Sequence, residues 1–405
     1  MATNKIGQRV QTDQSGLHSA NVLPQIALVD GNLDEGKFLV LMNQLPMFPT
    51  HNKKYTYWED DWLPANDTTS AAVAAGAVTI DVTTVLAYNA GQTWKNKRTG
   101  EVIFITGVSE SAAQISVSRA VGRDSTNSTG TAPTAMNSGD TLVRMVPSMG
   151  ERSTRQIAQS TTPVERFNYS EKLRWEVSMT DVQAKTKHET GYDWPYQLDK
   201  TMRQARKDMN GWLYAGERNT KTVNGQKHWF SGGLNFFIST NSLTGSGTLH
   251  EYTLDDWMVD EGGRYGPSMK DLLASSGVIK AINQIGKDYI SIERSNLGTK
   301  DLAVGAMVRR YVSPTGVTME VHEDRWLSEN YSGYGYVVDF GVCRLRNFAG
   351  PDDDGHIKIY PNTQDTDADD IVATIRGDLG MEWGPEKHHG VMTGVTAGAR
   401  GRSVS

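Results

Sequence analysis

The sequence predicts an α+β protein with more than one core, because three kinds of segment follow one another along the chain. A strand-rich stretch comes first, a long amphipathic helix follows, and helices and strands then mix. The 405 residues are 38% hydrophobic. That is enough for about two or three cores, since single domains usually span about 100–200 residues.

The charge balance is mildly acidic, with 41 basic and 47 acidic residues and a formal net charge of -6. A dedicated nucleic-acid-binding protein is usually strongly basic, so this balance argues against that class of protein. Any contact with nucleic acid should therefore be local and weak.

Cys343 is the only cysteine, so the chain can form no internal disulfide and no cysteine-based zinc site. Residues 1–22 lack the basic-then-apolar pattern of a signal peptide, and no apolar run approaches the ~20 residues that span a bilayer. We therefore expect a soluble protein, made and kept in a cytoplasm, with no membrane partner.

Residues 1–36 are rich in Gln, Asn, Ser and Gly. They carry too few large apolar groups to offset the entropy of ordering by themselves. We expect an extended arm that becomes fixed against something else. The alternative is a terminus that stays loose and has no role.

Residues 63–147 show short runs in which apolar and polar side chains alternate, separated by turn residues. The alternating runs lie at 78–82, 102–106 and 115–118, and a further strand is expected at 141–145. This pattern predicts a compact antiparallel β-module with little room for helices.

Residues 194–215 are expected to form one helix about 30 Å long. Apolar residues recur at three- and four-residue steps and make a single stripe that should pack against a core. The stripe consists of Leu198, Met202, Ala205, Met209, Trp212 and Leu213. Asp193 is the expected N-terminal cap, and Gly216 suits the C-terminal end.

The other face of this helix is basic, with Lys200, Arg203, Arg206 and Lys207. The stretch 151–240 holds 14 basic and 10 acidic residues, a local excess of four. Such a face can contact the phosphates of nucleic acid, or it can simply be a solvated helix surface.

From about residue 250 onward, helices and strands alternate. We expect a short helix at 254–260, a buried strand at 271–274 and a helix from Ser276 to Lys287. Residues 306–312 and 317–322 should form a hairpin-like pair around the Pro314-Thr315-Gly316 turn. Two further strands are expected at 336–338 and 342–345, joined at 339–341.

Motifs for catalysis and metal binding are weak. The acidic run 365–370 has the alternating carboxylates of a calcium-binding loop. Such a loop requires Gly at its sixth position and Glu at its twelfth, where this chain has Asp370 and Arg376. We therefore interpret the run as a solvated acidic turn, and we interpret 352–355 in the same way. His388 and His389 are adjacent, so their side chains should point in different directions and would not bind one metal ion together without further ligands. With no Gly-x-Ser-x-Gly, P-loop or His-Glu-x-x-His motif, we expect no enzyme, no catalytic residue, no cofactor and no metal.

Three segments in this order and spacing resemble a known family. They are the strand-rich part 91–106, the strand-turn-strand 336–342, and the closing 377–385 with His388-His389-Gly390 after it. Together they resemble the major capsid, or major head, proteins of tailed bacteriophages with the Hong Kong 97-like fold. The similarity is to the branch with a β-rich insertion in the extended-loop region, related to the head protein of elongated-headed Escherichia podoviruses.

The resemblance implies a division of the chain into the parts of that fold. They are an N-terminal arm (1–45), an extended loop (46–165) with an inserted β-module (about 65–146), a peripheral domain (166–264) with a spine helix (about 194–215), an axial domain (265–350), and a return to the peripheral domain with a C-terminal tail (351–405).

The implied function is a non-enzymatic major capsid protein found in the virion and made in the bacterial host cytoplasm. It would self-assemble into pentamers and hexamers that form an icosahedral or prolate head around double-stranded DNA. Partners would be portal and scaffolding proteins and, as an option, a decoration protein, with non-specific DNA contact through the basic face of the helix. Lys95 and Lys97 match no cross-linking motif, so we predict no covalent cross-links between subunits.

Two other classes remain open from the sequence. A phage tail or fibre protein, or another β-rich virion protein or adhesin, would explain the turn residues, but it should show repeats, and none is found. An undetected hydrolase would require a deep pocket with clustered titratable groups.

Overall fold

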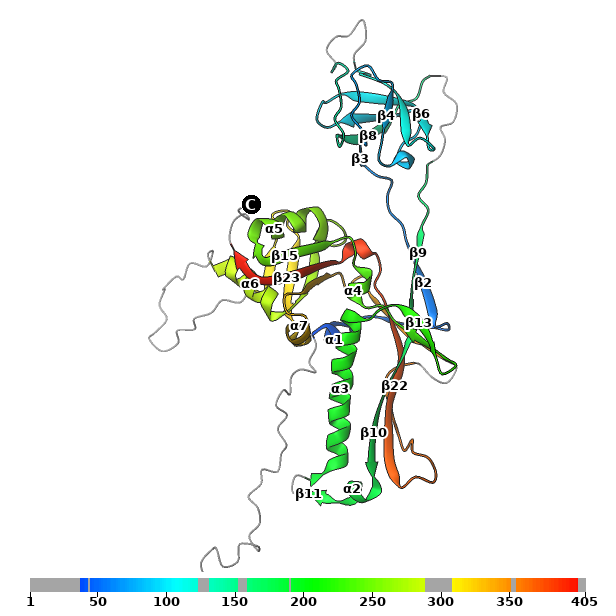
Figure 1. Ribbon diagram of the computed structural model, residues 1–405, viewed down its shortest axis with the longest axis vertical. Coiled ribbons are helices and arrows are strands. Elements are labelled where there is room, and N and C mark those ends of the chain that lie inside the picture. Colours follow the sequence, from blue (N-terminus) through cyan, green and yellow to red (C-terminus); the bar gives the residue numbers. More distant parts are fainter. Residues whose placement is uncertain are drawn as a thin grey trace, which may run out of the picture. The chain divides into compact units, whose positions relative to one another are not determined.

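The computed structural model describes residues 37–42, 44–122, 131–151, 159–188, 191–287, 308–350 and 355–399. It divides into two compact units (Figure 1). Unit 1 contains Met1–Tyr57 and Arg166–Ser405, and unit 2 contains Trp58–Glu165. The expected arm at 1–36 and the acidic residues 352–354 lie outside the described residues.

The described part of unit 2 forms one six-stranded antiparallel sheet with the order β3-β8-β5-β6-β7-β4. The strands are β3 (Asn66–Thr68), β4 (Thr79–Asp81), β5 (Gln92–Asn96), β6 (Val102–Ser109), β7 (Gln114–Ser118) and β8 (Thr141–Pro147). A bridge between Thr69 and Val82 joins the ends of the two outer strands, so the sheet closes into a small barrel. The predicted antiparallel β-module is confirmed.

The barrel has its own core, which follows from the alternation in its sequence. Ile103 and Ile105 of β6 are fully buried, and they pack with Trp94 of β5, Ile115 of β7 and Leu142 of β8. A short 3-10 turn (Val85–Ala87) is the helical element among the described residues of this unit. The barrel therefore buries enough apolar surface to make a core separate from those of unit 1.

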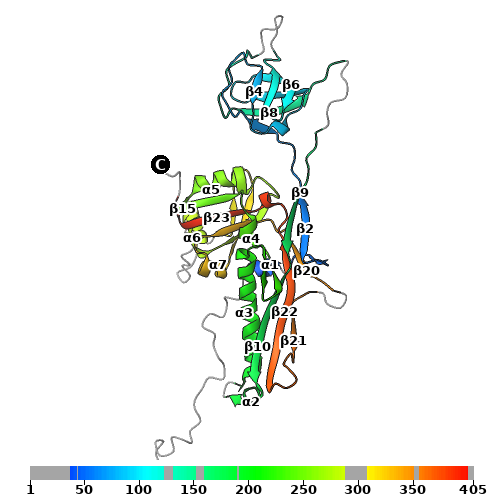
Figure 2. The same ribbon diagram turned by 45° about the vertical axis from the view of Figure 1, so that its right-hand side comes forward.

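The first sheet of unit 1 is built around the long strand β22 (Asp370–Glu382). One edge of β22 pairs with β10 (Glu171–Thr180), and the other pairs with β20 (Arg344–Phe348) and β21 (Lys358–Pro361), all antiparallel. Strand β1 (Met47–Thr50) adds to β20 in parallel. Helix α3 (Asp193–Ala215) lies along β10 and β22 (Figures 1 and 2).

The second sheet of unit 1 has the order β15-β23-β19-β16-β18-β17. Its strands are β15 (Ser242–His250), β16 (Met269–Ala274), β17 (Arg310–Val312), β18 (Thr318–Glu323), β19 (Gly335–Val338) and β23 (Gly390–Ala399). Helices α5 (Glu251–Trp257), which continues as a π turn (Met258–Gly262), and α6 (Ser276–Lys287) supply core residues to it. The predicted strand at 271–274, the helix at 276–287 and the β17–β18 hairpin are confirmed within the described residues.

The remaining elements of the described chain are short. They are α1 (Lys37–Met42), β2 (Lys54–Glu59), β9 (Val164–Tyr169), α2 (Asp181–Lys185), β11 (Lys187–His188), β12 (Gly191–Tyr192), β13 (Asn219–Val223), β14 (Gln226–Phe230), α4 (Leu234–Phe237), α7 (Arg325–Asn330) and η4 (Glu386–His388). Strands β2 and β9 pair with each other, and the division between the units falls within them.

Helix α3 begins one residue before the predicted range and ends at Ala215, as predicted. Asp193 is not its cap. It is the first helical residue, and its carboxylate accepts a hydrogen bond from Gln197 at 3.2 Å instead of capping a backbone N–H. Gly216 does close the helix, and its N–H donates to the Trp212 carbonyl.

The strands at 336–338 and 344–348 belong to different sheets, so the segment between them is not a hairpin turn. Asp339 holds this segment by accepting a hydrogen bond from the N–H of Gly341 at 3.0 Å. The chain crosses here from the second sheet to the first. Periodicity cannot reveal such a crossing, because each strand looks the same whichever neighbour it pairs with.

Candidate functional site

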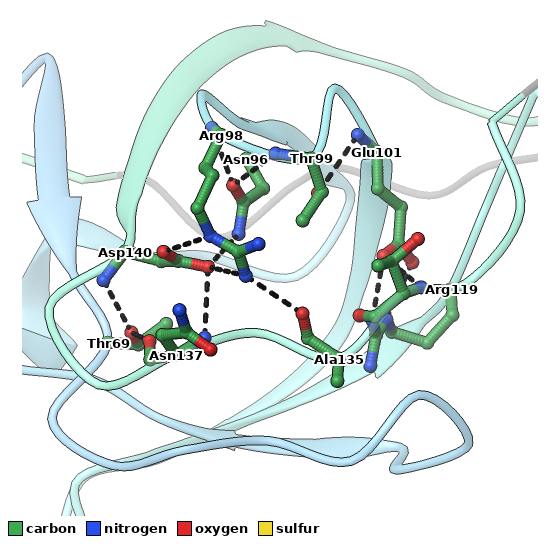
Figure 3. A network of polar contacts seen from close by, with 10 residues as sticks. Thr69, Asn96, Arg98, Thr99, Glu101, Arg119, Ala135, Asn137 and Asp140 are labelled. Carbon is green, nitrogen blue, oxygen red and sulfur yellow. Dashed lines mark hydrogen bonds and ion pairs between the residues drawn. The ribbon is translucent and has the colours of Figure 1, made fainter.

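A network of charged side chains fixes the loops at one end of the barrel (Figure 3). Arg98 donates from Nε and Nη2 to the two oxygens of Asp140, both at 2.7 Å. Asn96 and the N–H of Asn137 also donate to Asp140. The hydrogen bonds from Arg98 lower the pKa of Asp140 to about 2, against the opposing effect of its burial.

A second ion pair in the same network joins Glu101 to Arg119. Glu101 is 0% exposed, and Arg119 contacts both of its oxygens, at 2.6 and 2.7 Å. The carboxylate also accepts from the N–H groups of Ala120 and Thr134. These four donors compensate the buried charge of Glu101, so the ion pair stabilises the loops of the barrel and does not form a reactive site.

Unit 1 contains a buried polar cluster where β16 meets the turns at 339–341 and 386–389. Lys270 is 1% exposed, and its ammonium donates to the carbonyls of Gly262 and His388 at 2.9 and 2.7 Å. Burial lowers the pKa of Lys270 to about 8. His388 contacts Asp339 at 2.9 Å, which helps to hold the pKa of that carboxyl below its usual range.

His389 is fully buried beside this cluster, and burial lowers its pKa to about 4. The ring is therefore neutral at pH 7. Its Nε2 donates to the Trp383 carbonyl at 2.6 Å, and its Nδ1 accepts from the N–H of Asp339 at 3.3 Å. The side chains of His388 and His389 diverge to different partners, as their adjacency predicts.

One group of potential metal ligands was missed from the sequence. Among the described residues, Asp271, Glu320 and His322 bring one ligand atom each within 4.8 Å of one another, and His322 Nε2 lies 2.9 Å from Asp271 Oδ1. The register of β16 with β18 places Asp271 opposite Glu320. However, Arg310 is opposite Glu320 on β17, and a cation on the same face disfavours a metal ion.

The predicted packing stripe of α3 meets the core only over its second half. Ala205 and Leu213 are buried, and Met209 and Trp212 are partly buried against a cluster that includes Phe38 and Trp383. Leu198 and Met202 are only half-buried. The first half of the helix is therefore less deeply packed than the second.

The basic face of α3 is partly neutralised by its own surroundings. Arg203 forms an ion pair with Asp199 at 2.9 Å, and Lys207 forms one with Glu329 of α7 at 3.4 Å. Lys200 and Arg206 are exposed. The face is less positive than the four basic residues alone predict.

A second basic surface lies on the sheet that α3 packs against, and periodicity along the chain did not predict it. Arg174 of β10, Arg376 of β22 and Lys358 of β21 are register partners across three adjacent strands. Lys172 is two residues from Arg174 on the same face. We call these four exposed residues the basic row.

Two hollows in the described part of the chain bear on the hydrolase alternative. In unit 2 a hollow of about 680 Å³ is lined by Asp60, Asp61, Trp62, Leu63, Arg144, Gln159, Ser160 and Thr161. Its lining includes the adjacent carboxylates of Asp60 and Asp61 and the guanidinium of Arg144, but no histidine, cysteine or lysine. A hollow of about 220 Å³ in unit 1 is mainly apolar, with Met42, Met209 and Trp212 in its wall. Asp60 and Asp61 are exposed, whereas the hydrolase alternative requires titratable groups that cluster in a deep pocket.

A family model described as the SU10 major capsid protein matches residues 15–396. The chain belongs to the SU10 major capsid protein family. This membership confirms the resemblance to tailed-phage capsid proteins, and the α+β class agrees with the expectation. It places the chain in a family of structural capsid proteins, and it favours that interpretation over a fibre protein or a hydrolase.

Solved structures of low identity are also similar to this chain. A structure described as the capsid of a native GTA particle has 8% identity and a TM-score of 0.48, covering 97% of this chain and 100% of that one. The holo-SrpI encapsulin complex from Synechococcus elongatus has 9% identity and a TM-score of 0.45, covering 99% and 100%. A chain from Mycobacterium phage Patience has 11% identity and a TM-score of 0.40, covering 63% and 77%.

Among curated proteins, none matches this sequence. In the described part of the chain, no helix has both the length and the apolar composition that crossing a bilayer requires.

Proposed function

We propose that this protein forms the head shell of a tailed phage by assembling into pentamers and hexamers that enclose double-stranded DNA. The observation that carries the proposal is the family match over residues 15–396. Repeated copies in a closed lattice need only modest individual contacts, because each further contact of a subunit that is already held forms at high effective concentration.

Within this proposal each part of the chain has a role. Residues 1–45 act as an arm over neighbouring subunits, and 46–165 form an extended loop that carries the barrel. Residues 166–264 and 351–405 form a peripheral domain with α3 as its spine, and 265–350 form an axial domain near the local symmetry axis. The separate core of unit 2 supports the assignment of a loop with an inserted module.

We assign the barrel the task of holding adjacent capsomers together, in place of a separate cementing protein. Several large apolar side chains of unit 2 point to solvent although the barrel has a complete core. Trp62 is 92% exposed and Val146 77% exposed, and Leu86 and Val78 are also largely exposed. Aromatic and aliphatic groups left in water in this way are typical of protein interfaces.

The remaining partners follow from the same proposal. A portal and a scaffolding protein would act during assembly in the host cytoplasm, a decoration protein is optional, and the finished protein resides in the virion. The inner surface contacts DNA phosphates without reading sequence, and the basic face of α3 is a candidate for this contact. Subunits are held without covalent cross-links.

The test is electron microscopy of the purified protein after concentration. Closed shells, or rings of five and six subunits, are expected. Rods or trimers would indicate a fibre protein, and small discrete oligomers without rings would contradict the proposal. Boiled, SDS-treated particles should run as single subunits on a gel, because a ladder of high-mass bands would reveal cross-links.

The role of the barrel is tested by replacing residues 65–146 with a short flexible linker. We expect shells that still form but open at a lower temperature than the parent shells. Shells with unchanged resistance to heat would refute the proposal that the barrel holds adjacent capsomers together. A second variant keeps the barrel and replaces the exposed Trp62 and Val146 of unit 2 with Ser, which should give part of the same loss of heat resistance.

A further inference from the structure

The hollow of about 680 Å³ in unit 2, called the unit 2 hollow below, is built from three separate parts of the chain. They are residues 60–63, which lead into β3, Arg144 of β8, and residues 159–161, which lead out toward β9. Pockets of about 300–1,000 Å³ hold a drug-sized ligand, so several side chains of a partner fit into this one. Its lining combines charged and polar side chains with Trp62, which is 92% exposed.

Gln159 fixes the part of the wall that belongs to β8. Its Nε2 donates to the carbonyls of Leu86 and Tyr88 at 2.8 and 3.2 Å. Its Oε1 accepts from Gln92 at 2.9 Å and from Arg144 at 3.2 Å. Both donors and both lone pairs of the amide are therefore used within the chain. Gln159 has no hydrogen-bonding capacity left for a partner, but it holds the guanidinium of Arg144 in place.

Two local hydrogen bonds fix the part of the wall formed by 60–63. Asp60 Oδ1 accepts from the N–H of Asp61 at 2.9 Å, and Asp61 Oδ1 accepts from the N–H of Trp62 at 2.9 Å. Asp61 has a further partner within the chain, so it is not counted as available here. Asp60 is exposed, and its carboxylate can accept hydrogen bonds from another molecule.

The unit 2 hollow therefore presents a carboxylate and a guanidinium that do not meet. Asp60 and Arg144 line the same hollow, and no ion pair joins either of them to a described residue. A guanidinium with one hydrogen bond to an amide keeps most of its five donors for other acceptors. Opposite charges on one surface make that surface self-complementary, because two copies that face each other each supply what the other lacks.

Apolar side chains lie beside these charges. Residues 142, 144 and 146 of β8 alternate onto one face of the strand. Leu142 is buried in the barrel core, whereas Val146 is 77% exposed, so this face passes from the core into solvent. Leu86, whose carbonyl binds Gln159, is 67% exposed. Exposed apolar groups next to fixed charged groups are typical of contacts between subunits.

We propose that the unit 2 hollow is the surface through which unit 2 contacts unit 2 of a second copy, with Asp60 of each copy facing Arg144 of the other. This inference rests on the proposed function, and it names the partner and the surface by which the barrel holds adjacent capsomers together. The reciprocal arrangement gives two ion pairs in each contact. The charges select the partner and its orientation, while burial of Trp62 and Val146 supplies the apolar part of the contact.

A second copy fits this surface better than a partner with charge of one sign. An acidic partner would be repelled by Asp60, and a basic partner would be repelled by Arg144. A neutral ligand would leave both charges without a counter-charge, and the amide of Gln159 could not bind it. A surface that carries both charges at fixed positions satisfies both of them, and the protein itself has such a surface.

The experiment exchanges the two charges in the full-length protein. Asp60→Arg and Arg144→Glu are made singly, together in one chain, and as an equal mixture of the two single variants. Light scattering measures the lowest protein concentration at which shells form, and electron microscopy identifies the products. The matched control makes Glu110→Arg and Lys97→Glu in the same four combinations, since both residues are exposed in unit 2 and neither lines the hollow.

Each single variant should need a concentration higher by about tenfold or more, because every contact then has two like-charge pairs in place of two ion pairs. In the double variant the exchanged charges attract each other again. In the mixture, contacts between unlike variants also have two attractive pairs. Both should therefore assemble within about threefold of the parent concentration, as should all the control variants.

Single variants that assemble like the parent overturn the inference. A mixture as impaired as its two components also overturns it, because the two residues would then act within their own chain or on a different partner. An equal loss in the control variants would overturn it as well. Hydrogen–deuterium exchange of barrel peptides should match the parent in every variant, and faster exchange that mixing does not relieve would assign Arg144 a structural role only.

The parent protein separates this inference from the proposed function. A parent that forms no shells would refute the proposed function. Sedimentation velocity of the unassembled protein would then read the contact alone, and its dimers should show the same loss in the single variants and the same recovery in the mixture. Absence of dimers, or dimers that the charges do not affect, would refute the inference too.

Discussion

Replacing Arg119 with Met should destabilise the barrel strongly, because it leaves a buried carboxylate without its partner. Arg119 gives two hydrogen bonds to Glu101 and three to the carbonyls of Ala74, Ala77 and Thr134. In the variant Glu101 keeps only two backbone donors. Water cannot easily replace the lost ones, since Glu101 is completely buried. Breaking such a pair costs about 3–5 kcal/mol.

Hydrogen–deuterium exchange of the full-length protein, read on peptides from β6 and β7, measures this cost locally. A loss of 3–5 kcal/mol corresponds to exchange that is faster by a factor of roughly 10² to 10³ or more, up to the limit set by complete unfolding of the barrel. The double variant Glu101→Leu with Arg119→Met should recover much of the loss, because it buries no charge. A cost below about 1 kcal/mol for Arg119→Met, or no recovery in the double variant, would refute this account of the pair.

Three further predictions concern other contacts. Burial lowers the pKa of His389 to about 4, below its value in the unfolded chain. The stability of unit 1 should therefore fall as the pH drops from about 6.5 to 4. Denaturation curves of the His389→Gln variant should lack that part of the pH dependence. The lowered pKa of Asp140 adds stability at neutral pH that should be lost between about pH 4 and 2, and Asp140→Asn should remove it from the exchange rates of barrel peptides. Gly211→Ala should lower the melting temperature, since its Cβ would lie 2.6 Å from the Trp326 ring, and Trp326→Leu in the same chain should relieve the clash; an unchanged melting temperature would contradict this.

The features predicted correctly from the sequence are those encoded in local periodicity. Strands of the barrel follow from alternation with a period of two, as at Ile103 and Ile105, and α3 follows from a stripe with a period near 3.6. Both patterns arise because each element must turn one side toward a core. The error at Asp193 is of a different kind, because a carboxylate there can bind Gln197 as readily as a backbone N–H.

The features that were missed depend on which strands become neighbours. Arg174, Lys358 and Arg376 are far apart in the sequence, and only the pairing of β10 and β21 with β22 aligns them. The grouping of Asp271 with Glu320 depends in the same way on the register of β16 and β18. Strand register is set by long-range packing, and a shift of one residue would turn each of these side chains to the other face.

Closure of the barrel constrains how it can meet a neighbouring subunit under the proposed function. The Thr69–Val82 bridge removes the free edge between β3 and β4, so this side of the barrel cannot accept an added strand. Contacts must then come from exposed side chains such as Trp62, Leu86 and Val146. Contacts of that kind should weaken on cooling, as hydrophobic contacts do, whereas contacts between charged groups weaken when salt is added. The mechanical strength of the shells should therefore differ between about 4 and 25 °C. Shells whose strength depends on salt alone would contradict the proposal that apolar side chains of unit 2 hold adjacent capsomers together.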